Sequence, residues 1–194
     1  MPSGWPLVGW SAAGIGLMAG ALFAASGTGD AGLRLVIRAT ARTSVILFTL
    51  AITASALRRR WPTSATRWLL ANRRYLGVSF GVSHFVHLLA ILALTGWSVR
   101  GFFTEAGPVA GIAGGLGYVV LAAMVATSFD ATADWLGPAA WRRLHTTGLY
   151  YLWFVFFATF APQVPRVPLV AGPFTLLLLL ALALRLRDGS TRVR

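Results

Sequence analysis

The sequence predicts an all-α membrane protein, a single domain over residues 1–194 built as a bundle of six transmembrane helices. Of the 194 residues, 57% are hydrophobic and only 11% are charged, whereas soluble domains carry about 25% charged residues. The apolar residues gather in runs of about 20, which is the length that spans a bilayer as a helix. This composition excludes a disordered chain, and the absence of cysteine excludes a disulfide-stapled fold.

Six apolar runs are the predicted spans. In chain order they cover residues 7–25, 35–57, 75–94, 109–127, 141–160 and 169–186. The segments between them are short, and none is long enough to form a flavin-binding or nicotinamide-binding domain. Any chemistry that the chain carries out is therefore expected to lie within the bilayer.

The arginines predict the orientation of these spans. All 17 basic residues are arginine, and the net charge is +12. One side of the membrane would carry Arg58, Arg59, Arg60, Arg67, Arg73, Arg74, Arg142, Arg143, Arg185, Arg187, Arg192 and Arg194, and the other Arg34, Arg100 and Arg166. Because basic residues stay on the cytoplasmic side, both termini are predicted to be cytoplasmic, in a bacterial inner membrane. The basic charge then indicates a lipid bilayer, and no nucleic acid, as the partner.

Three histidines are candidates for a cofactor site, because ionisable residues inside a span are costly and are usually functional. His84 and His87 lie in the third run and His145 near the start of the fifth. A neutral imidazole is a common axial ligand of b-type haem, and the third and fifth runs are predicted to be parallel. A haem between them would take one imidazole from each. The alternatives are interhelical hydrogen bonds and, less favoured for want of acids or cysteines in the spans, a zinc site.

Two arginines also lie inside a span. Arg38 and Arg42 continue a four-residue stripe from Arg34 into the second run. Arg42 lies about 12 Å deeper than Arg34 at 1.5 Å of rise per residue. Arg42 is therefore expected to face a haem propionate, a quinone oxygen or a cluster of backbone carbonyls.

Glycines spaced four residues apart recur at Gly77/Gly81, and also at Gly16/Gly20 and Gly111/Gly115. Such pairs favour close packing between transmembrane helices. Gly77 and Gly81 share nearly one helical face with His84, so the alternative is a smooth surface on which a flat cofactor lies.

Three segments together resemble a known family. The second run contains Ala41-Arg-Thr-Ser-Val45, the third opens with Arg73-Arg-Tyr-Leu-Gly77 and reaches His87, and Trp141-Arg-Arg-Leu-His145 leads into the fifth. The chain thereby resembles the ferric reductase-like transmembrane domain, and within it the haem-binding membrane subunit of the bacterial methionine sulfoxide reductase system. The resemblance covers more than half of the chain, from the second run to the fifth.

This resemblance implies a six-helix bundle that holds haem b and passes electrons across the membrane, with a quinol or a flavoprotein as donor and a quinone as a second cofactor. His87 and His145 match family ligand positions, and His84 would be a substitute or supporting group. Arg42, Arg73 and Arg74 would contact the propionates or the membrane interface. With haem bound, the chain would be an oxidoreductase subunit that works with a redox partner protein.

The sequence also departs from the family pattern. Ala158 and Arg73 stand where partner histidines would face His87 and His145. Those two histidines differ in depth by about 16 Å, whereas two imidazoles on one iron must lie at nearly equal depth. Three outcomes stay open: a haem held by one histidine, a methionine ligand from Met18 or Met124, or a haem-free structural or assembly subunit of a membrane complex.

Overall fold

The computed structural model describes residues 1–190 and is helical throughout that part of the chain. Its long helices are α1 (Trp5–Ser26), α2 (Asp30–Arg60), α4 (Arg73–Leu94), α6 (Pro108–Ala126), α8 (Pro138–Phe160) and α9 (Pro168–Ser190). Between them lie the short α3 (Ser64–Ala71), α5 (Val99–Ala106), α7 (Asp130–Leu136) and η1 (Ala161–Gln163). Each predicted apolar run is a helix. Arg192 and Arg194, two of the predicted cytoplasmic arginines, lie outside the described residues.

Five of these helices are long and apolar enough to cross a membrane. In the described part of the chain they are α1, α2, α4, α6 and the α9 segment Pro168–Arg187. The 23-residue α8 is long enough but is not in this set, and its first turns carry Arg142, Arg143 and His145. The coarse prediction of a helical, multi-pass membrane protein is therefore supported.

Short helices occupy three segments that were predicted only as connections. α3 begins at Thr63, whose side chain accepts a hydrogen bond from the Thr66 backbone N–H while the Thr66 hydroxyl accepts one from the Thr63 backbone N–H. This reciprocal pair satisfies two N–H groups that a helix start leaves open. α5 begins in a similar way at Ser98, whose hydroxyl accepts from the Gly101 N–H.

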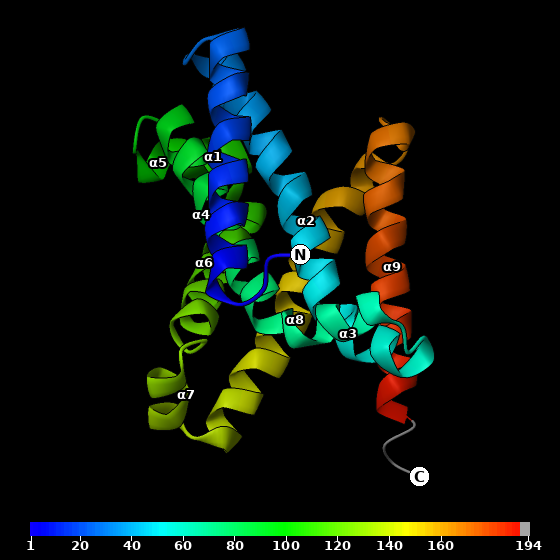
Figure 1. Ribbon diagram of the computed structural model, residues 1–194. Coiled ribbons are helices and arrows are strands. Elements are labelled where there is room, and N and C mark those ends of the chain that lie inside the picture. The colour runs from blue at the N-terminus through cyan, green and yellow to red at the C-terminus, as the bar shows by residue number, and fades with distance from the viewer. Residues whose placement is uncertain (191–194) are drawn as a thin grey trace.

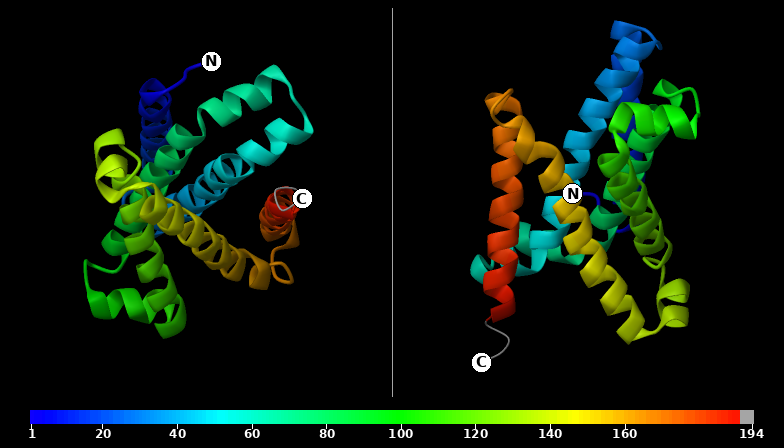
Figure 2. Two further views of the ribbon diagram at one scale, coloured as in Figure 1. Left: turned by 90° about the horizontal axis from the view of Figure 1, so that it is seen from below. Right: turned by 180° about the vertical axis from the view of Figure 1, so that it is seen from behind.

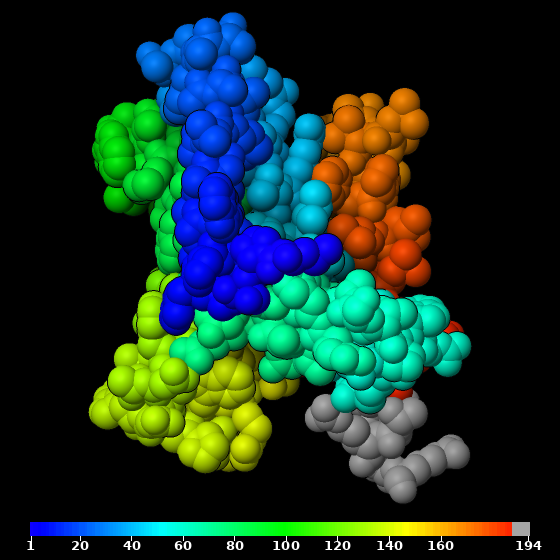
Figure 3. Space-filling model, viewed as in Figure 1, coloured from blue at the N-terminus to red at the C-terminus, as the bar shows by residue number. Residues whose placement is uncertain are grey.

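The long helices alternate in direction along the chain (Figure 1). α1, α4 and α8 run upward in that view, and α2, α6 and α9 run downward. The lower end therefore collects α3, α7 and the C-terminal end of α9, while the upper end collects α5 and the turn between α1 and α2. In Figure 3, the first residues lie across the start of α4 and α3, where Gly4 N–H donates to Asn72 Oδ1 (2.9 Å).

α2 and α4 form the centre of the bundle, with α1 against α4 and α9 against α2. α8 is strongly tilted: its start lies beside α6 and its end beside α9 (Figure 2). The tilt leaves α8 in direct contact mainly with α6 and α9. Two cavities lie between α8 and the α2–α4 pair.

Small hydroxyl residues line the contact between α2 and α4. Thr40, Ser44, Ser79 and Ser83 are completely buried. The Ser44 hydroxyl donates to Ser83 Oγ (3.0 Å), and the Ser83 hydroxyl donates to the Thr40 carbonyl oxygen (3.2 Å). Small residues of this kind let helix backbones approach closely inside a membrane.

An aromatic layer occupies the middle of the molecule. The ring centroids of Phe48 and Phe80 are 5.3 Å apart, and each lies within 6 Å of the ring of Phe156. All three are buried in the main apolar core with Val45 and Leu121. This layer separates the two cavities, because Phe48 and Phe80 line one and Phe156 lines the other.

Candidate functional site

The three histidines line two different cavities. The first, here called the α5 cavity, has a volume of about 560 Å³ and is lined by His84 and His87 together with residues of α2, α5, α6 and α8. The second, the α7 cavity, has a volume of about 630 Å³ and is lined by His145 with residues of α2, α4, α6, α7 and α9. Both volumes are in the range of small-molecule sites. His87 and His145 therefore do not face a common cavity, as their difference in depth predicts.

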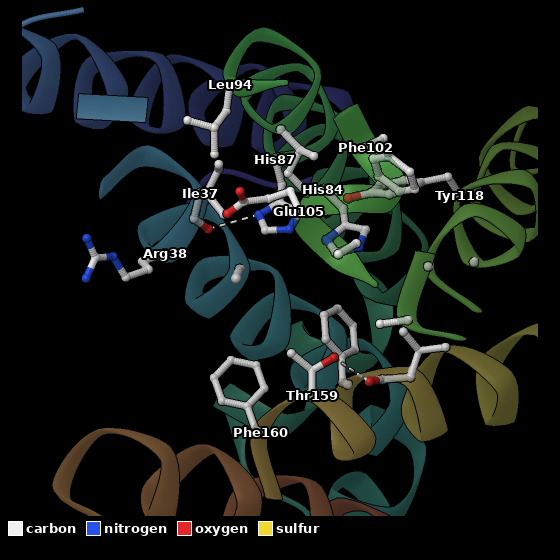
Figure 4. Close-up of a pocket in the computed structure, with 18 of the residues that line it drawn as sticks. Ile37, Arg38, His84, His87, Leu94, Phe102, Glu105, Tyr118, Thr159 and Phe160 are labelled. Atoms are coloured by element: carbon white, nitrogen blue, oxygen red, sulfur yellow. Dashed lines mark hydrogen bonds between the residues drawn. The ribbon is translucent and has the colours of Figure 1, made fainter. Parts of the chain in front are cut away.

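His87 is held in a fixed orientation by α2. Its Nδ1 lies 2.9 Å from the Ile37 carbonyl oxygen and 3.2 Å from the Thr40 hydroxyl (Figure 4). A carbonyl oxygen can only accept, so Nδ1 carries the proton and donates it. In a neutral imidazole the other nitrogen, Nε2, is then the one with a free lone pair.

His84 lies one turn earlier on α4, in a stack of rings. Its ring lies 5.1 Å from that of His87 at an interplanar angle of 8°, and 4.9 Å from that of Tyr118 on α6. The Nδ1 atom of His84 is buried and has no hydrogen-bond partner among the described residues. A buried polar atom without a partner costs about 1–3 kcal/mol, so this atom indicates a place where a ligand would bind.

The remaining walls of the α5 cavity are small or apolar. α2 and α6 contribute Ala41, Ala110, Gly114 and Gly117, while α8 faces the histidines with Val155, Phe156, Thr159 and Phe160. In Figure 4, Thr159 and Phe160 lie across the cavity from His84 and His87. Among its described lining residues, α8 offers neither an imidazole nor a thioether, and Ala158 does not line the cavity.

Charged groups lie at the α5 end of this cavity. Arg34 forms an ion pair with Glu105 of α5 through both carboxylate oxygens, and this interaction lowers the pKa of the exposed Glu105 carboxyl. Arg38 also lines the cavity, with Nε donating to the Arg34 carbonyl oxygen (3.1 Å) and its guanidinium pointing away from the histidines in Figure 4. Arg42, the predicted deep anion partner, lines neither cavity.

The residues of the α5 cavity fit a b-type haem held from one side. The fit depends on the free Nε2 of His87, the unpartnered Nδ1 of His84 and a wall of small side chains that leaves room for a planar group. His84 and His87 project as parallel rings from adjacent turns of one helix, so they cannot hold a planar group from opposite faces. A single histidine ligand is the arrangement that these residues allow.

His145 is placed differently in the α7 cavity. Its Nε2 lies 3.0 Å from the Thr127 hydroxyl, and its ring stacks on Trp141 with centroids 4.1 Å apart. The Thr127 hydroxyl donates to the Ala123 carbonyl oxygen (2.8 Å). With its single proton used there, Thr127 accepts from His145, so Nε2–H is a donor and Nδ1 holds the lone pair. The predicted ligation of iron by His145 stays a prediction.

Arginines from three helices line the α7 cavity. They are Arg73 and Arg74 at the start of α4, Arg142 on α8 and Arg185 on α9. Arg74 donates to the Ser128 carbonyl oxygen and forms an ion pair with Asp130 (2.6 Å). Arg73 Nη1 donates to the Ser55 hydroxyl (3.0 Å). Arg73 and Arg74, predicted to lie near a propionate or the membrane interface, thus belong to the cavity that does not contain His87.

Gly77 and Gly81, the predicted glycine pair of the third run, have different surroundings. Gly77 lines the α7 cavity, and a Cβ at this position would meet nothing within 4 Å. A Cβ at Gly81 would lie 2.5 Å from Val125 Cγ2, so Gly81 serves close packing of α4 against α6. The two methionine candidates also separate, because Met124 lines the α7 cavity whereas Met18 lines neither.

Sequence reasoning missed several residues of the cavities. Tyr118 stacks on His84, Glu105 pairs with Arg34, and Trp141 covers His145 while its Nε1 donates to the Thr127 carbonyl oxygen (2.9 Å). Glu105 carried a signal, because it is the one acid between the third and fourth predicted spans. Tyr118 is a polar aromatic residue in a glycine-rich run, but nothing local shows which helix it faces.

Comparisons of the chain with protein-family models, with curated proteins and with solved structures find no match in any of the three. The fold and the cavities define the class: a helical protein whose described residues form five helices long and apolar enough to span a membrane, with one cavity that contains two histidines and one that is rich in arginine. In the described residues, histidine, cysteine and acidic side chains do not gather in a group of three that would hold a metal ion.

Proposed function

We propose that this chain is a haem-b-binding membrane protein of the ferric reductase-like type that passes electrons across the bilayer. The α5 cavity would hold the haem, with His87 as the side chain that would bind its iron. One observation carries the proposal: the Ile37 carbonyl oxygen accepts a hydrogen bond from Nδ1–H of His87, which leaves Nε2 with the lone pair on a residue that lines the cavity. Histidines that bind a metal are usually fixed in this way through the other ring nitrogen.

Other side chains of the cavity would position the cofactor. The ring of His84 stacks on those of His87 and Tyr118, and Gly114 and Gly117, close to Tyr118 on α6, line the cavity without side chains. Arg34 and Arg38 supply positive charge for carboxylates such as propionates. A bound haem b supplies reversible one-electron chemistry of its iron.

The side chains around the α5 cavity limit which residues would bind the iron of a haem. α8 presents Val155 and Thr159 to the cavity, and neither is a usual haem ligand. His84 lies on the same side as His87. His87 would therefore be the single protein ligand to the iron, and a haem held in this way is expected to give a high-spin spectrum.

The proposal includes the arrangement in the membrane. α8 would be a sixth span, with both termini on the cytoplasmic side of a bacterial inner membrane. The end that holds α3 and α7 would face the cytoplasm, because it carries most of the arginines. With no nucleotide-binding domain in the described fold, electrons would come from a quinol or from a flavoprotein partner.

Visible spectroscopy of the detergent-purified protein tests this function. We expect about one haem b per chain by pyridine haemochrome, with a high-spin reduced-minus-oxidised spectrum. His87→Ala should lose most of the haem, and His145→Ala, in the other cavity, should keep it. Wild-type protein that contains no haem after expression with haem precursor, or haem that survives in His87→Ala, contradicts the proposal.

One observation favours a second candidate, a haem-free structural or assembly subunit of a membrane complex. A face of α6 formed by Val109, Ile112, Leu116 and Val119 is more than half exposed at each residue. These residues recur at spacings of three and four and so share one side of the helix. Colourless protein that copurifies with a membrane partner, and loses it when Leu116 becomes Ser, would support this candidate.

A further inference from the structure

The α7 cavity is lined by more arginines than carboxylates. Four arginines line it, and Asp130 is the single carboxylate among its described lining residues. Asp130 is already paired with Arg74. Asp130 is therefore not available to the other arginines of the cavity. Arg142 of α8 and Arg185 of α9 form no ion pair with a carboxylate in the described part of the chain.

Arg185 is the more confined of these two arginines. Its guanidinium lies over the ring of Tyr150, with Cζ 5.6 Å from the ring centroid, and Nη1 reaches the Ile52 carbonyl oxygen at 3.5 Å. Its Nε is buried and has no hydrogen-bond partner among the described residues. A buried charged donor of this kind needs an acceptor, and an anionic oxygen is the strongest one available.

Arg142 completes the rim from α8. Its side chain is exposed at the start of that helix and forms no ion pair with a described residue. Arg142 and Arg185 lie 43 residues apart in the chain, yet both line the α7 cavity, together with Arg73. A group that accepts hydrogen bonds from several directions, such as a phosphate, matches donors that come from separate helices.

Beyond the arginines, the cavity is apolar. Phe48, Ile52 and Phe80 line it from α2 and α4, and Leu121 and Leu149 line it from α6 and α8. An occupant that satisfies both parts carries negative charge at one end and hydrocarbon at the other. Basic pockets between transmembrane helices bind the head groups of anionic lipids in this way.

We infer that the α7 cavity binds a phosphate-bearing lipid, whose head group is held by Arg142 and Arg185 and whose acyl chains lie against the apolar wall. His145 lines the same cavity, with its Nε2 hydrogen-bonded to Thr127 and one face of its ring covered by Trp141. The lipid site lies on the far side of the aromatic layer from the α5 cavity, so it does not depend on the proposed haem function.

Lipid titration of the full-length protein tests this inference. Thermal unfolding in detergent is measured with added phosphatidylglycerol, with phosphatidylcholine of the same acyl chains, and with inorganic phosphate, and native mass spectrometry counts the lipids retained. We expect phosphatidylglycerol alone to raise the melting temperature and to stay bound. Arg142→Gln and Arg185→Gln should each weaken its apparent affinity about tenfold or more, the scale of one lost charge-assisted hydrogen bond.

Arg100→Gln is the matched control, because Arg100 is exposed on α5 at the other end of the bundle and lines neither cavity. It should bind phosphatidylglycerol as the wild type does. If Arg185→Gln does not fold, the exposed Arg142 decides the result. The inference is overturned if the two lipids stabilise equally, if inorganic phosphate reproduces the whole effect, or if Arg142→Gln instead removes a second haem from the protein.

Discussion

For single residues of this bundle, the contacts of neighbouring atoms decide what a side chain can bind or how large it can be. His87 is informative because one carbonyl oxygen, that of Ile37, fixes which nitrogen is free. Gly81 is informative because it has no side chain: a Cβ there would lie 2.5 Å from Val125 Cγ2, whereas a Cβ at Gly16 of α1 would meet nothing within 4 Å. Replacing each of these two helical glycines by alanine is therefore expected to change stability in opposite directions.

At this scale we predict that Gly81→Ala destabilises the protein relative to Gly16→Ala by about 1–3 kcal/mol, the usual cost of overpacking. The stiff, branched side chain of Val125 cannot move aside without turning into another rotamer. Gly16→Ala should be neutral or stabilising by up to about 1 kcal/mol, because alanine favours a helix more than glycine does. Unfolding in detergent measures both variants, and equal stability would show that α4 and α6 do not pack closely at this point.

At the scale of elements, the α2–α4 pair is the part of the fold on which both cavities depend. Its buried hydroxyls take the place of larger apolar side chains and keep the two backbones close. The Ser44–Ser83 hydrogen bond and the bond from Ser83 to the Thr40 carbonyl oxygen lie next to the Thr40–His87 contact. Helix packing and histidine orientation are therefore coupled in one short stretch.

A double-mutant cycle of Ser44→Ala and Ser83→Ala measures this contact. We expect a coupling free energy of about 0.6 kcal/mol, the average for interhelical hydrogen bonds in a membrane protein, and no more than about 1.7 kcal/mol. Each single variant removes one partner of the 3.0 Å bond and leaves the other in place. Strictly additive unfolding free energies would mean that the two hydroxyls do not interact in the folded protein.

At the scale of the whole molecule, the alternating helices place nearly all charge at two ends. α3, α7 and most arginines gather at one end, and α5 with its Arg34–Glu105 pair lies at the other. Ser64 of α3 precedes α4 and Val99 of α5 follows it, so these two residues lie on opposite sides of any membrane that α4 crosses. Both are exposed, and the chain contains no cysteine of its own.

Because the wild type has no cysteine, a single introduced cysteine reports which side of the membrane its position faces. In intact bacterial cells, we predict that a membrane-impermeant maleimide labels Val99→Cys but labels Ser64→Cys only after the cells are broken. The cysteine-free wild type is the control for background labelling. The reverse pattern would place the arginine-rich end outside, and labelling of both variants in intact cells would contradict a membrane crossing by α4.

The sequence by itself determined the six long helices, because a run of about 20 apolar residues and the charges that flank it are local properties of the chain. It also indicated that His87 and His145 could not share one iron, because helical rise converts residue number into depth. It did not show the short helices α3, α5 and α7, of which α3 and α5 start with side-chain caps made of one or two hydrogen bonds between neighbouring residues.

Only the tertiary structure decided how the polar residues are shared between the cavities. The tilt of α8 opens two spaces beside α2 and α4, and the aromatic layer of Phe48, Phe80 and Phe156 divides them. Helix tilt and rotation result from packing between residues far apart in the chain. For that physical reason no local pattern could place Arg185 and Arg142 in one cavity, or Tyr118 beside His84, whereas the helices that carry them could be read from the sequence.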